Sequence, residues 1–403
     1  MKPLQLKTLA YFENLSERAI DYLASNSDIN PKMSRKFTEA EASKYLLCDR
    51  KTLRRYCEEI GINPYKYVED GIAWLIDLEE IYSIRDAMSP GTTLKKKFKP
   101  FVRSDKQRQH RLVIQNQNGG GAKTMTAITL ATGLATEFHE QYKVLAVDMD
   151  PKSTLTSFQP SDSDRISVGD LFMLDPETEP DYIEKVKASV SDTTIPNLKI
   201  LPASQRDMDL DFHCHKLISE GCTPYSLYRR LDSILNALDG MFDIVIIDTP
   251  PSVNFSSLNA YFAASCVIFP LAADHNDRDS TLNYFTYISE MYKTLIKLDH
   301  RGYDFCRMLI TNYEPSSDTH SEVFFDISAI FPTDLYSEQF KKSEAVRKCS
   351  MEFNTIFDIS SACYNGTSTT HKTAVQNATV VITQILQEMK VLWDKQEKSS
   401  YEF

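Results

Sequence analysis

A chain of 403 residues, of which 42% are hydrophobic and 25% charged, has the composition of an ordinary folded protein and enough length for two or three domains. No run approaches the roughly 18 apolar residues of a membrane span, and the first 30 residues lack the pattern of a secretory signal. These features argue against membrane and secreted classes, and they predict a cytoplasmic protein. The net charge of −11 is uneven, because residues 1–110 carry 20 Lys and Arg against 16 Asp and Glu, whereas the remainder carries 25 against 40. A basic amino-terminal segment followed by an acidic remainder indicates that the amino-terminal segment binds an anion such as nucleic acid.

The eight cysteines are scattered without a Cys-x-x-Cys pair, which is typical of reduced, mostly buried thiols in a cytosolic protein. His213, Cys214 and His215 are adjacent in the sequence, but nothing nearby completes a tetrahedral ligand set. We therefore expect no metal site at these three residues.

The amino-terminal segment is expected to form one helix near residues 5–25, because apolar residues recur there at helical spacing. We assign residues 1–30 to this helix, with dimerisation as one role that it could serve. A compact unit follows over residues 31–88.

Two short helices are predicted within this compact unit. Thr38 with Glu41 forms a capping box before the first helix, which runs through Leu47. Asp49 can cap a second helix over residues 50–60, which a glycine then ends. Two helices joined by a tight turn are typical of a helix-turn-helix whose second helix reads DNA.

The predicted recognition helix is rich in basic residues. Residues 67–74 after it alternate around Asp70-Gly71, which predicts a hairpin and hence a wing. A helical packing domain with solvated charges is the alternative, but we favour DNA contact because the basic residues concentrate on the second helix. These residues are Arg50, Lys51, Arg54 and Arg55.

Residues 89–110 are the expected linker to the next domain. Residues 89–111 hold eight basic side chains against one acid, Asp105. Such a run serves either solubility or salt-sensitive contacts with phosphate, and the sequence favours neither explanation.

Residues 111–403 are expected to form an α/β domain, because strands and helices alternate as a mostly parallel sheet with helices on both faces requires. The expected strands are nearly continuous apolar runs, which is typical of strands covered on both faces. A last helix near residues 370–393 carries an apolar stripe that fits core packing better than membrane binding. The expected strands are 112–116, 143–148, 198–201, 242–247, 266–270 and 306–311, with a late one near 355–357.

The loop after the first of these strands is rich in glycine and ends in a lysine and a threonine. Three successive glycines let backbone N–H groups turn toward one point, and Lys123 adds a positive charge there. Thr124 places a hydroxyl where a magnesium ion would lie beside a phosphate. The loop therefore predicts a cradle for a nucleoside triphosphate, formed by Gly119, Gly120, Gly121, Lys123 and Thr124.

Three carboxylates follow the ends of two expected strands. Asp148 and Asp150 come after one strand, and Asp248 ends another. Because the carboxyl ends of parallel strands meet at one edge of a sheet, these groups and the glycine loop are expected to converge. Asp248 would hold the water shell of magnesium, and one of the other two would orient the attacking water. Helix caps or turns are the structural alternative, which three acids in phase with such a loop make less favourable.

These motifs together resemble a known family. Residues 117–124 fit the deviant P-loop pattern x-Lys-Gly-Gly-x-x-Lys-[Ser/Thr] except at Asn118, and Ala122 stands where the usual P-loop has glycine. With Asp148-Met149-Asp150-Pro151 and Asp248-Thr249-Pro250-Pro251, the chain resembles the ParA-type partition ATPases, which are related to MinD and the nitrogenase iron protein. The expected helix-turn-helix, Ser343-Glu344-Ala345 and Thr355-Ile356-Phe357-Asp358 are similar to the larger ParA subclass of plasmids and secondary chromosomes.

The resemblance implies ATP and Mg²⁺ as cofactors and suggests a role for each motif residue. Lys123 would bind the β- and γ-phosphates, and Thr124 with Asp248 would bind the magnesium. Asp150 would position the hydrolytic water with Asp148 beside it. The nucleotide would also contact Gly119, Gly120, Gly121, Ala122, Met125 and, near the base, Asn312.

The resemblance further implies partners. ATP-bound dimers would bind DNA without sequence preference, in some cases as filaments, and a ParB-type centromere-binding protein would stimulate hydrolysis. We expect a cytoplasmic, nucleoid-associated protein without a membrane partner. A group of basic residues is expected either on the DNA face or on a solvated helix face: Lys341, Lys342, Arg347 and Lys348.

Asn118 departs from the family pattern, in which a signature lysine reaches the phosphates of the partner's nucleotide. A short neutral amide supplies no charge, so we expect ATP binding with slow hydrolysis, and Lys152 would partly compensate. The predicted function is a DNA-segregation ATPase. An ATP-responsive DNA-binding regulator without significant hydrolysis is the alternative, which Asn118 favours and the intact Asp150 and Asp248 do not. A MinD-like membrane protein would need a terminal amphipathic helix, and a reductase would need bridging cysteines.

Overall fold

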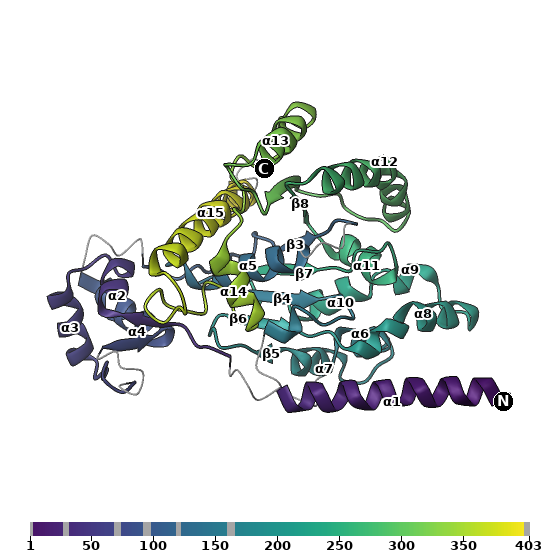
Figure 1. The fold of residues 1–403 in the computed structure, drawn as a ribbon, viewed down its shortest axis with the longest axis horizontal. Helices are drawn as coiled ribbons and strands as arrows, with labels where there is room; N and C mark the ends of the chain where they lie inside the picture. Colours follow the sequence, from purple (N-terminus) through teal and green to yellow (C-terminus); the bar gives the residue numbers. More distant parts are fainter. Residues whose placement is uncertain are drawn as a thin grey trace.

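The computed structural model describes residues 3–26, 32–67, 74–91, 98–117, 122–158 and 166–398. A seven-stranded sheet lies at the centre of the body, in the order β5-β6-β4-β7-β3-β8-β9, with helices on both faces (Figure 1). Every neighbouring pair is parallel except β5 with β6, so the predicted mostly parallel α/β fold is confirmed. The strands are β3 His110–Ile114, β4 Val144–Asp148, β5 Ser191–Asp192, β6 Leu198–Leu201, β7 Ile244–Asp248, β8 Cys266–Ala272 and β9 Phe305–Thr311.

The alternation of side chains along the strands builds two separate hydrophobic cores. In β7, Ile244 and Ile246 face one core, whereas Val245 and Ile247 face the other. All five residues of β4 and of β7 are buried, which explains their continuous apolar sequence. The first core contains residues of α5 Ala122–Thr136, α14 Glu344–Met351 and α15 Ser368–Lys398. The second contains residues of α6 Val168–Phe172, α7 Tyr182–Ser189, α8 Leu210–Ser219, α9 Pro224–Leu227, α10 Arg230–Ala237, α11 Phe255–Ala263, α12 His275–Lys297 and α13 Asp318–Ile330.

The strand predicted near residues 355–357 is wrong. This segment forms turns in which the amide of Thr355 donates to the Asp358 carboxylate at 2.6 Å, and the amide of Phe357 donates to the Thr355 hydroxyl at 3.1 Å. Side-chain acceptors thus take the backbone donors that a strand would offer to a neighbour. Ile356 and Phe357 are still buried, so the apolar run reflects core packing without a strand.

The amino-terminal segment contains one long helix and a small mixed unit. The predicted opening helix is confirmed as α1, Pro3–Asn26, and its described side chains from Gln5 to Tyr22 are exposed. The unit pairs β1 with β2 in antiparallel fashion, and the predicted capping box of Thr38 with Glu41 is present. Most of the predicted wing over residues 67–74 lies outside the described residues. The elements of the unit are β1 Lys36–Thr38, α2 Glu39–Tyr45, α3 Arg50–Glu59, β2 Leu75–Asp77 and α4 Leu78–Met88.

The mixed unit is seated on the carboxyl end of α5. Tyr45 donates its hydroxyl to the Thr136 carbonyl at 2.8 Å, and Tyr82 donates to the Ala135 carbonyl at 3.0 Å. Arg85, which is fully buried, donates to a further carbonyl just beyond this helix. These side chains satisfy carbonyls that a helix end leaves without intrahelical partners. One helix of 15 residues, about 22 Å long, therefore joins this unit to the glycine loop.

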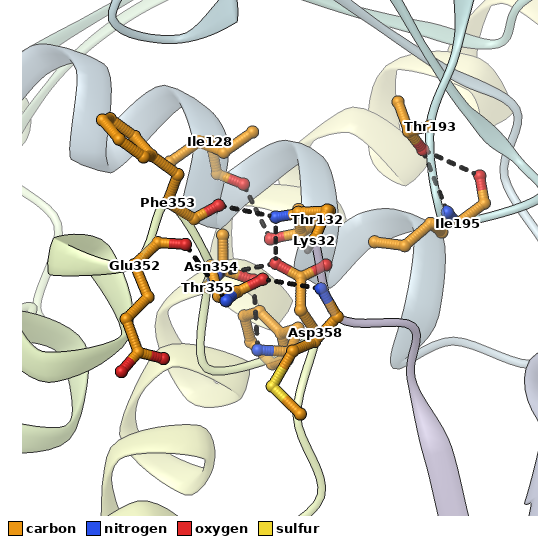
Figure 2. A network of polar contacts seen from close by, with 12 residues as sticks. Lys32, Ile128, Thr132, Thr193, Ile195, Glu352, Phe353, Asn354, Thr355 and Asp358 are labelled. Carbon is orange, nitrogen blue, oxygen red and sulfur yellow. Dashed lines mark hydrogen bonds and ion pairs between the residues drawn. The ribbon is translucent and has the colours of Figure 1, made fainter. Parts of the chain in front are cut away.

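A short segment before β1 is fastened to the loop after α14 (Figure 2). The Lys32 ammonium donates to the Phe353 carbonyl at 2.8 Å and to the Asp358 carboxylate at 2.9 Å. The amide of Met33 donates to Asn354 in the same loop. The Lys32 and Asp358 side chains are 8% and 1% exposed, so this ion pair is largely shielded from water.

Part of the expected linker packs against the body. Phe98 is fully buried, and the indole of Trp393 in α15 donates to the Arg108 carbonyl at 2.8 Å. Arg103 forms an ion pair with Asp239 at 2.6 Å. Residues 98–109 are thus held along the amino-terminal edge of the sheet.

Candidate nucleotide-binding site

Of the predicted site residues, Asp148, Asp248 and Lys123 come together at the carboxyl ends of the central strands. The glycine loop follows β3, and α5 begins immediately after it at Ala122. Asn118, Gly119, Gly120 and Gly121 lie outside the described residues. A helix amino terminus directs backbone N–H groups and a partial positive charge outward, so the start of α5 suits an anion at this place.

Asp148 and Asp248 are brought side by side by the sheet. They end the neighbouring strands β4 and β7 and lie opposite each other in register. Both are fully buried. Burial raises the pKa of Asp148 to about 7, and burial together with the adjacent Asp148 raises the pKa of Asp248 well above its ordinary value. Two buried carboxylates at this spacing favour a bound cation or a shared proton.

The two carboxylates differ in their hydrogen bonds. Asp148 accepts from the backbone amide of Thr156 at 2.8 Å and from its hydroxyl at 2.7 Å, and from the amide of Asp150 at 3.1 Å. Asp148 therefore shapes the loop after β4. No close hydrogen bond to either carboxylate oxygen of Asp248 is found in the described part of the chain, but the Thr124 hydroxyl acts on the group as a hydrogen-bond donor and, with Lys123, favours its ionised form. A buried carboxylate with so few donors is costly, and a metal ion with its water shell would satisfy it.

Lys123 is held in the same place. Its side chain is buried, and burial lowers the pKa of its ammonium, whereas Asp248 and Asp150 favour the charged form. Lys152 lies near enough to oppose that charge. The Lys123 ammonium could bind a phosphate, and the carboxylates of Asp150 and Asp248 near it could face a magnesium ion bound to that phosphate.

Asp150 lies on the loop between β4 and the Thr156 contact. It is half-buried, and one of its oxygens accepts the amide of Lys152 at 3.0 Å. Ser153, three residues after Asp150, has a positive φ of 55°, so the loop turns sharply there. The Asp150 carboxylate remains close enough to Lys123 to favour its charged form.

The remaining predicted contacts are less closely grouped. Met125 is partly buried against the first core, one turn into α5. Asn312 follows β9 with a φ of 52° and is exposed. Because β8 lies between β9 and β3, Asn312 is at the same edge of the sheet but two strands away from the glycine loop.

Four polar residues that sequence reasoning missed hold the start of the loop. Thr249 donates its hydroxyl to the Ile114 carbonyl at 2.8 Å and contacts the Gln115 amide oxygen. Asn116 donates to the Pro270 carbonyl and to the Thr281 hydroxyl, each at 2.8 Å. All four are buried polar groups. The available signal was the position of Gln115 and Asn116 shortly before the glycines and of Thr249 directly after Asp248, whereas nothing in the sequence pointed to Thr281 in α12.

The two sets of predicted DNA-binding residues lie on separate elements. On α3 the side chains of Arg50, Arg54 and Arg55 are about three-fifths exposed, and each approaches a glutamate of the same unit. The second set lies in and before α14 and is exposed. Arg347 there pairs with Glu344, and the other basic residues of the set are Lys341, Lys342 and Lys348.

Comparison with known proteins agrees with this arrangement. Residues 109–298 match the family described as an AAA domain. A plasmid partition protein A of Escherichia coli is 22% identical over 65% of this chain and 67% of its own, and a chromosome partitioning protein ParA of Myxococcus xanthus is 25% identical over 59% and 77%. The chain is a relative of the ParA-type partition ATPases. The predicted resemblance is thereby confirmed.

A ParA-like fold is also found among solved structures. One described as a partition protein has a TM-score of 0.59 and 18% identity, with 87% of this chain and 97% of that chain covered. The ParA-type fold thus extends over most of the chain. Among the described residues, no helix is long and apolar enough to cross a membrane.

Proposed function

We propose that the chain is an ATP-dependent DNA partition protein of a plasmid or secondary chromosome. The observation that carries this proposal is the buried Asp148–Asp248 pair near Lys123, because within the described residues Asp248 has only the Thr124 hydroxyl and the Lys123 ammonium to favour its charge. Such a group fits Mg²⁺, which prefers carboxylate and water oxygens. The family resemblance supplies ATP as the nucleotide.

Each residue of the site has a task in this proposal. Lys123 and the amides of residues 119–124 bind the phosphates, and the Thr124 hydroxyl with Asp248 holds the magnesium. The bound metal neutralises the charge that develops on the transferred phosphoryl group. Asp150 orients the attacking water, and Asp148 fixes the loop that carries Asp150. The other proposed nucleotide contacts are Gly119, Gly120, Gly121, Ala122, Met125 and Asn312.

Hydrolysis is proposed to be slow because Asn118 lacks the charge of the family's signature lysine. A missing cation at a developing phosphate charge costs a few kcal/mol of transition-state stabilisation, about 2.7–4 kcal/mol in comparable cases. Lys152 is near Lys123 and supplies part of that charge. ATP would therefore be bound well and turned over slowly until a partner stimulates the protein.

DNA is the proposed partner of two surfaces. The exposed arginines of α3 would read an operator, while Lys341, Lys342, Arg347 and Lys348 would contact phosphates without sequence preference in the ATP-bound dimer. A ParB-type protein would stimulate hydrolysis, and the protein would lie in the cytoplasm on the nucleoid. The exposed arginines of α3 belong to the unit that contacts the carboxyl end of α5, and the proposed nucleotide site lies at the amino end of the same helix. The helix α5 therefore connects the two proposed sites.

An ATP-responsive DNA-binding regulator without significant hydrolysis is the second candidate, and Asn118 favours it. Phosphate release, measured with and without DNA and a ParB-type partner, separates the two. Stimulated turnover supports partition, and its absence with intact ATP binding supports the regulator.

Titration calorimetry with ATP and Mg²⁺ tests the site itself. We expect one nucleotide per chain, with loss of uptake in Lys123→Ala and loss of magnesium dependence in Asp248→Asn. Absence of uptake by the folded wild-type protein, or uptake unchanged in both variants, contradicts the proposed site.

A further inference from the structure

Three side chains with metal-binding groups meet at the edge of the sheet opposite the nucleotide site. His110 begins β3, Cys266 begins β8, and Asp304 directly precedes β9. A ring nitrogen, the Sγ atom and a carboxylate oxygen of these residues lie within 4.8 Å of one another. Because β3, β8 and β9 are neighbours in the sheet, the backbone ladder fixes His110 and Cys266 and brings the residue before β9 to the same edge. His110 and Cys266 are buried, and Asp304 is exposed.

We propose that His110, Cys266 and Asp304 bind a zinc ion, with water as the fourth ligand. Zinc accepts this mixture of nitrogen, sulfur and oxygen donors in tetrahedral geometry. Zinc–ligand bonds of about 2.0–2.3 Å place neighbouring ligand atoms roughly 3.5 Å apart. The cluster must contract by about 1 Å, and the exposed Asp304, outside the strand ladder, supplies that movement.

Each of the three groups already has an outer partner that leaves one donor atom available. Nε2 of His110 contacts the Met389 carbonyl at 3.0 Å. Because a carbonyl only accepts, Nε2 carries the proton and Nδ1 keeps its lone pair for a metal. Arg301 pairs with Oδ2 of Asp304 at 3.0 Å, which leaves Oδ1. The Ser265 hydroxyl lies 3.6 Å from the sulfur of Cys266.

Proton balance follows from the form in which each group binds a metal. The imidazole of His110 binds as the neutral ring and the carboxylate of Asp304 as the anion, whereas the thiol of Cys266 binds as its thiolate. Binding therefore breaks the S–H bond of Cys266, forms the zinc–sulfur bond and releases one proton to solvent.

The exposed Asp304 connects the cluster with solvent. A cavity of about 880 Å³ at this edge of the sheet is lined by Gln109, Ser265 and Arg301, which adjoin or contact the three proposed ligands. On its buried side, the ring of Trp393 lies 4.5 Å from that of His110. A bound ion would tie three strand ends together beneath α15, so its expected effect is to stabilise the fold.

Metal content and cobalt spectroscopy of the full chain test this site. The protein is loaded with Zn²⁺, dialysed and analysed for zinc, and in parallel it is titrated with Co²⁺, whose bond to a thiolate gives a charge-transfer band. We expect one ion per chain, a cobalt–thiolate band and a raised thermal midpoint with Zn²⁺. Cys266→Ser should lose the band, and the matched control Cys214→Ser, a buried cysteine in α8, should keep it.

A second variant, Asp304→Asn, tests the site in case Cys266→Ser fails to fold, because Asp304 is exposed and its replacement leaves the core unchanged. This variant should keep the wild-type far-ultraviolet circular dichroism and bind Co²⁺ at least about tenfold more weakly. Absence of the band in the wild-type protein overturns the proposal. So does a band that survives in Cys266→Ser, or a cobalt affinity unchanged in Asp304→Asn.

Discussion

Asp148 and Asp248 are register partners at the ends of β4 and β7, and both carboxylates are fully buried. The sheet thus holds two carboxyl groups side by side where burial disfavours their charged forms. Asp148 accepts two hydrogen bonds from Thr156, whereas only Thr124 and Lys123 favour the charge of Asp248. A bound cation would relieve this electrostatic cost, and the first prediction depends on it.

The first prediction concerns stability without nucleotide. Burial and the neighbouring Asp148 raise the folded pKa of Asp248 well above that of an unfolded aspartate near about 4. The folded state then binds more protons, so this contribution to the free energy of unfolding is lost as the pH rises above about 4 toward the folded pKa. We expect Asp248→Asn to raise the free energy of unfolding by about 1–2 kcal/mol at pH 7.5 and by less at pH 5.5. Denaturant unfolding at both pH values checks this.

An exposed carboxylate on α15, changed as Asp394→Asn, is the control and should shift neither value. Equal stabilisation of Asp248→Asn at both pH values would show that the pair carries no such strain.

The second prediction concerns Asn118. Asn118→Lys supplies the missing charge, and a gain of a few kcal/mol corresponds to roughly 10²-fold faster magnesium-dependent turnover. Phosphate release under saturating ATP measures it. Wild-type turnover equal to that of the variant would refute slow hydrolysis by the native chain.

The third prediction concerns Lys152. Its ammonium lies near Lys123, so in the native chain it should assist phosphoryl transfer in place of the absent lysine. Lys152→Ala should lower turnover about five- to tenfold in the native background and have little effect beside Asn118→Lys. The four proteins form a double-mutant cycle, and additive effects would show that the two positions act independently.

The fourth prediction separates the two DNA surfaces. Arg54 and Arg55 are exposed on α3, so Arg54→Glu with Arg55→Glu should abolish sequence-specific binding and leave ATP-dependent, non-specific binding intact. Lys341→Ala with Lys342→Ala should do the reverse and lower the salt slope by about 2. Fluorescence anisotropy across a salt series distinguishes them. Parallel loss of both modes in either variant argues against two surfaces.

The fifth prediction concerns the buried ion pair of Figure 2. Lys32→Met leaves Asp358 buried without its cation and should lower the free energy of unfolding by about 3 kcal/mol. Adding Asp358→Asn should recover part of that loss, because the uncompensated charge is gone. Denaturant unfolding measures both, and proteolysis should cut the single variant faster near residue 32. A single variant as stable as the wild type would show that the pair contributes nothing.

The sequence predicted most of the strands because their signal is local. Within these strands residues 144–147 and 244–247 are apolar throughout, and an aspartate follows each run and marks the carboxyl end. The same reasoning failed at residues 355–357, where an equally apolar run is buried in turns. An apolar run in the sequence indicates that a segment is buried. Whether the segment forms a strand or a turn depends on which groups accept hydrogen bonds from its backbone amides.

Residue types and their spacing along the chain were enough to predict the α/β class, a phosphate loop and three carboxylates near strand ends, because those predictions depend on local chemistry. The tertiary structure alone decided that Asp148 and Asp248 face each other, that Thr156 partners only one of them, and that the mixed amino-terminal unit rests on α5. It also brought His110, Cys266 and Asp304, which are 156 and 38 residues apart in turn, to one edge of the sheet. Strand order sets such neighbours, and strand order follows from packing across the whole chain, which no short window of sequence contains.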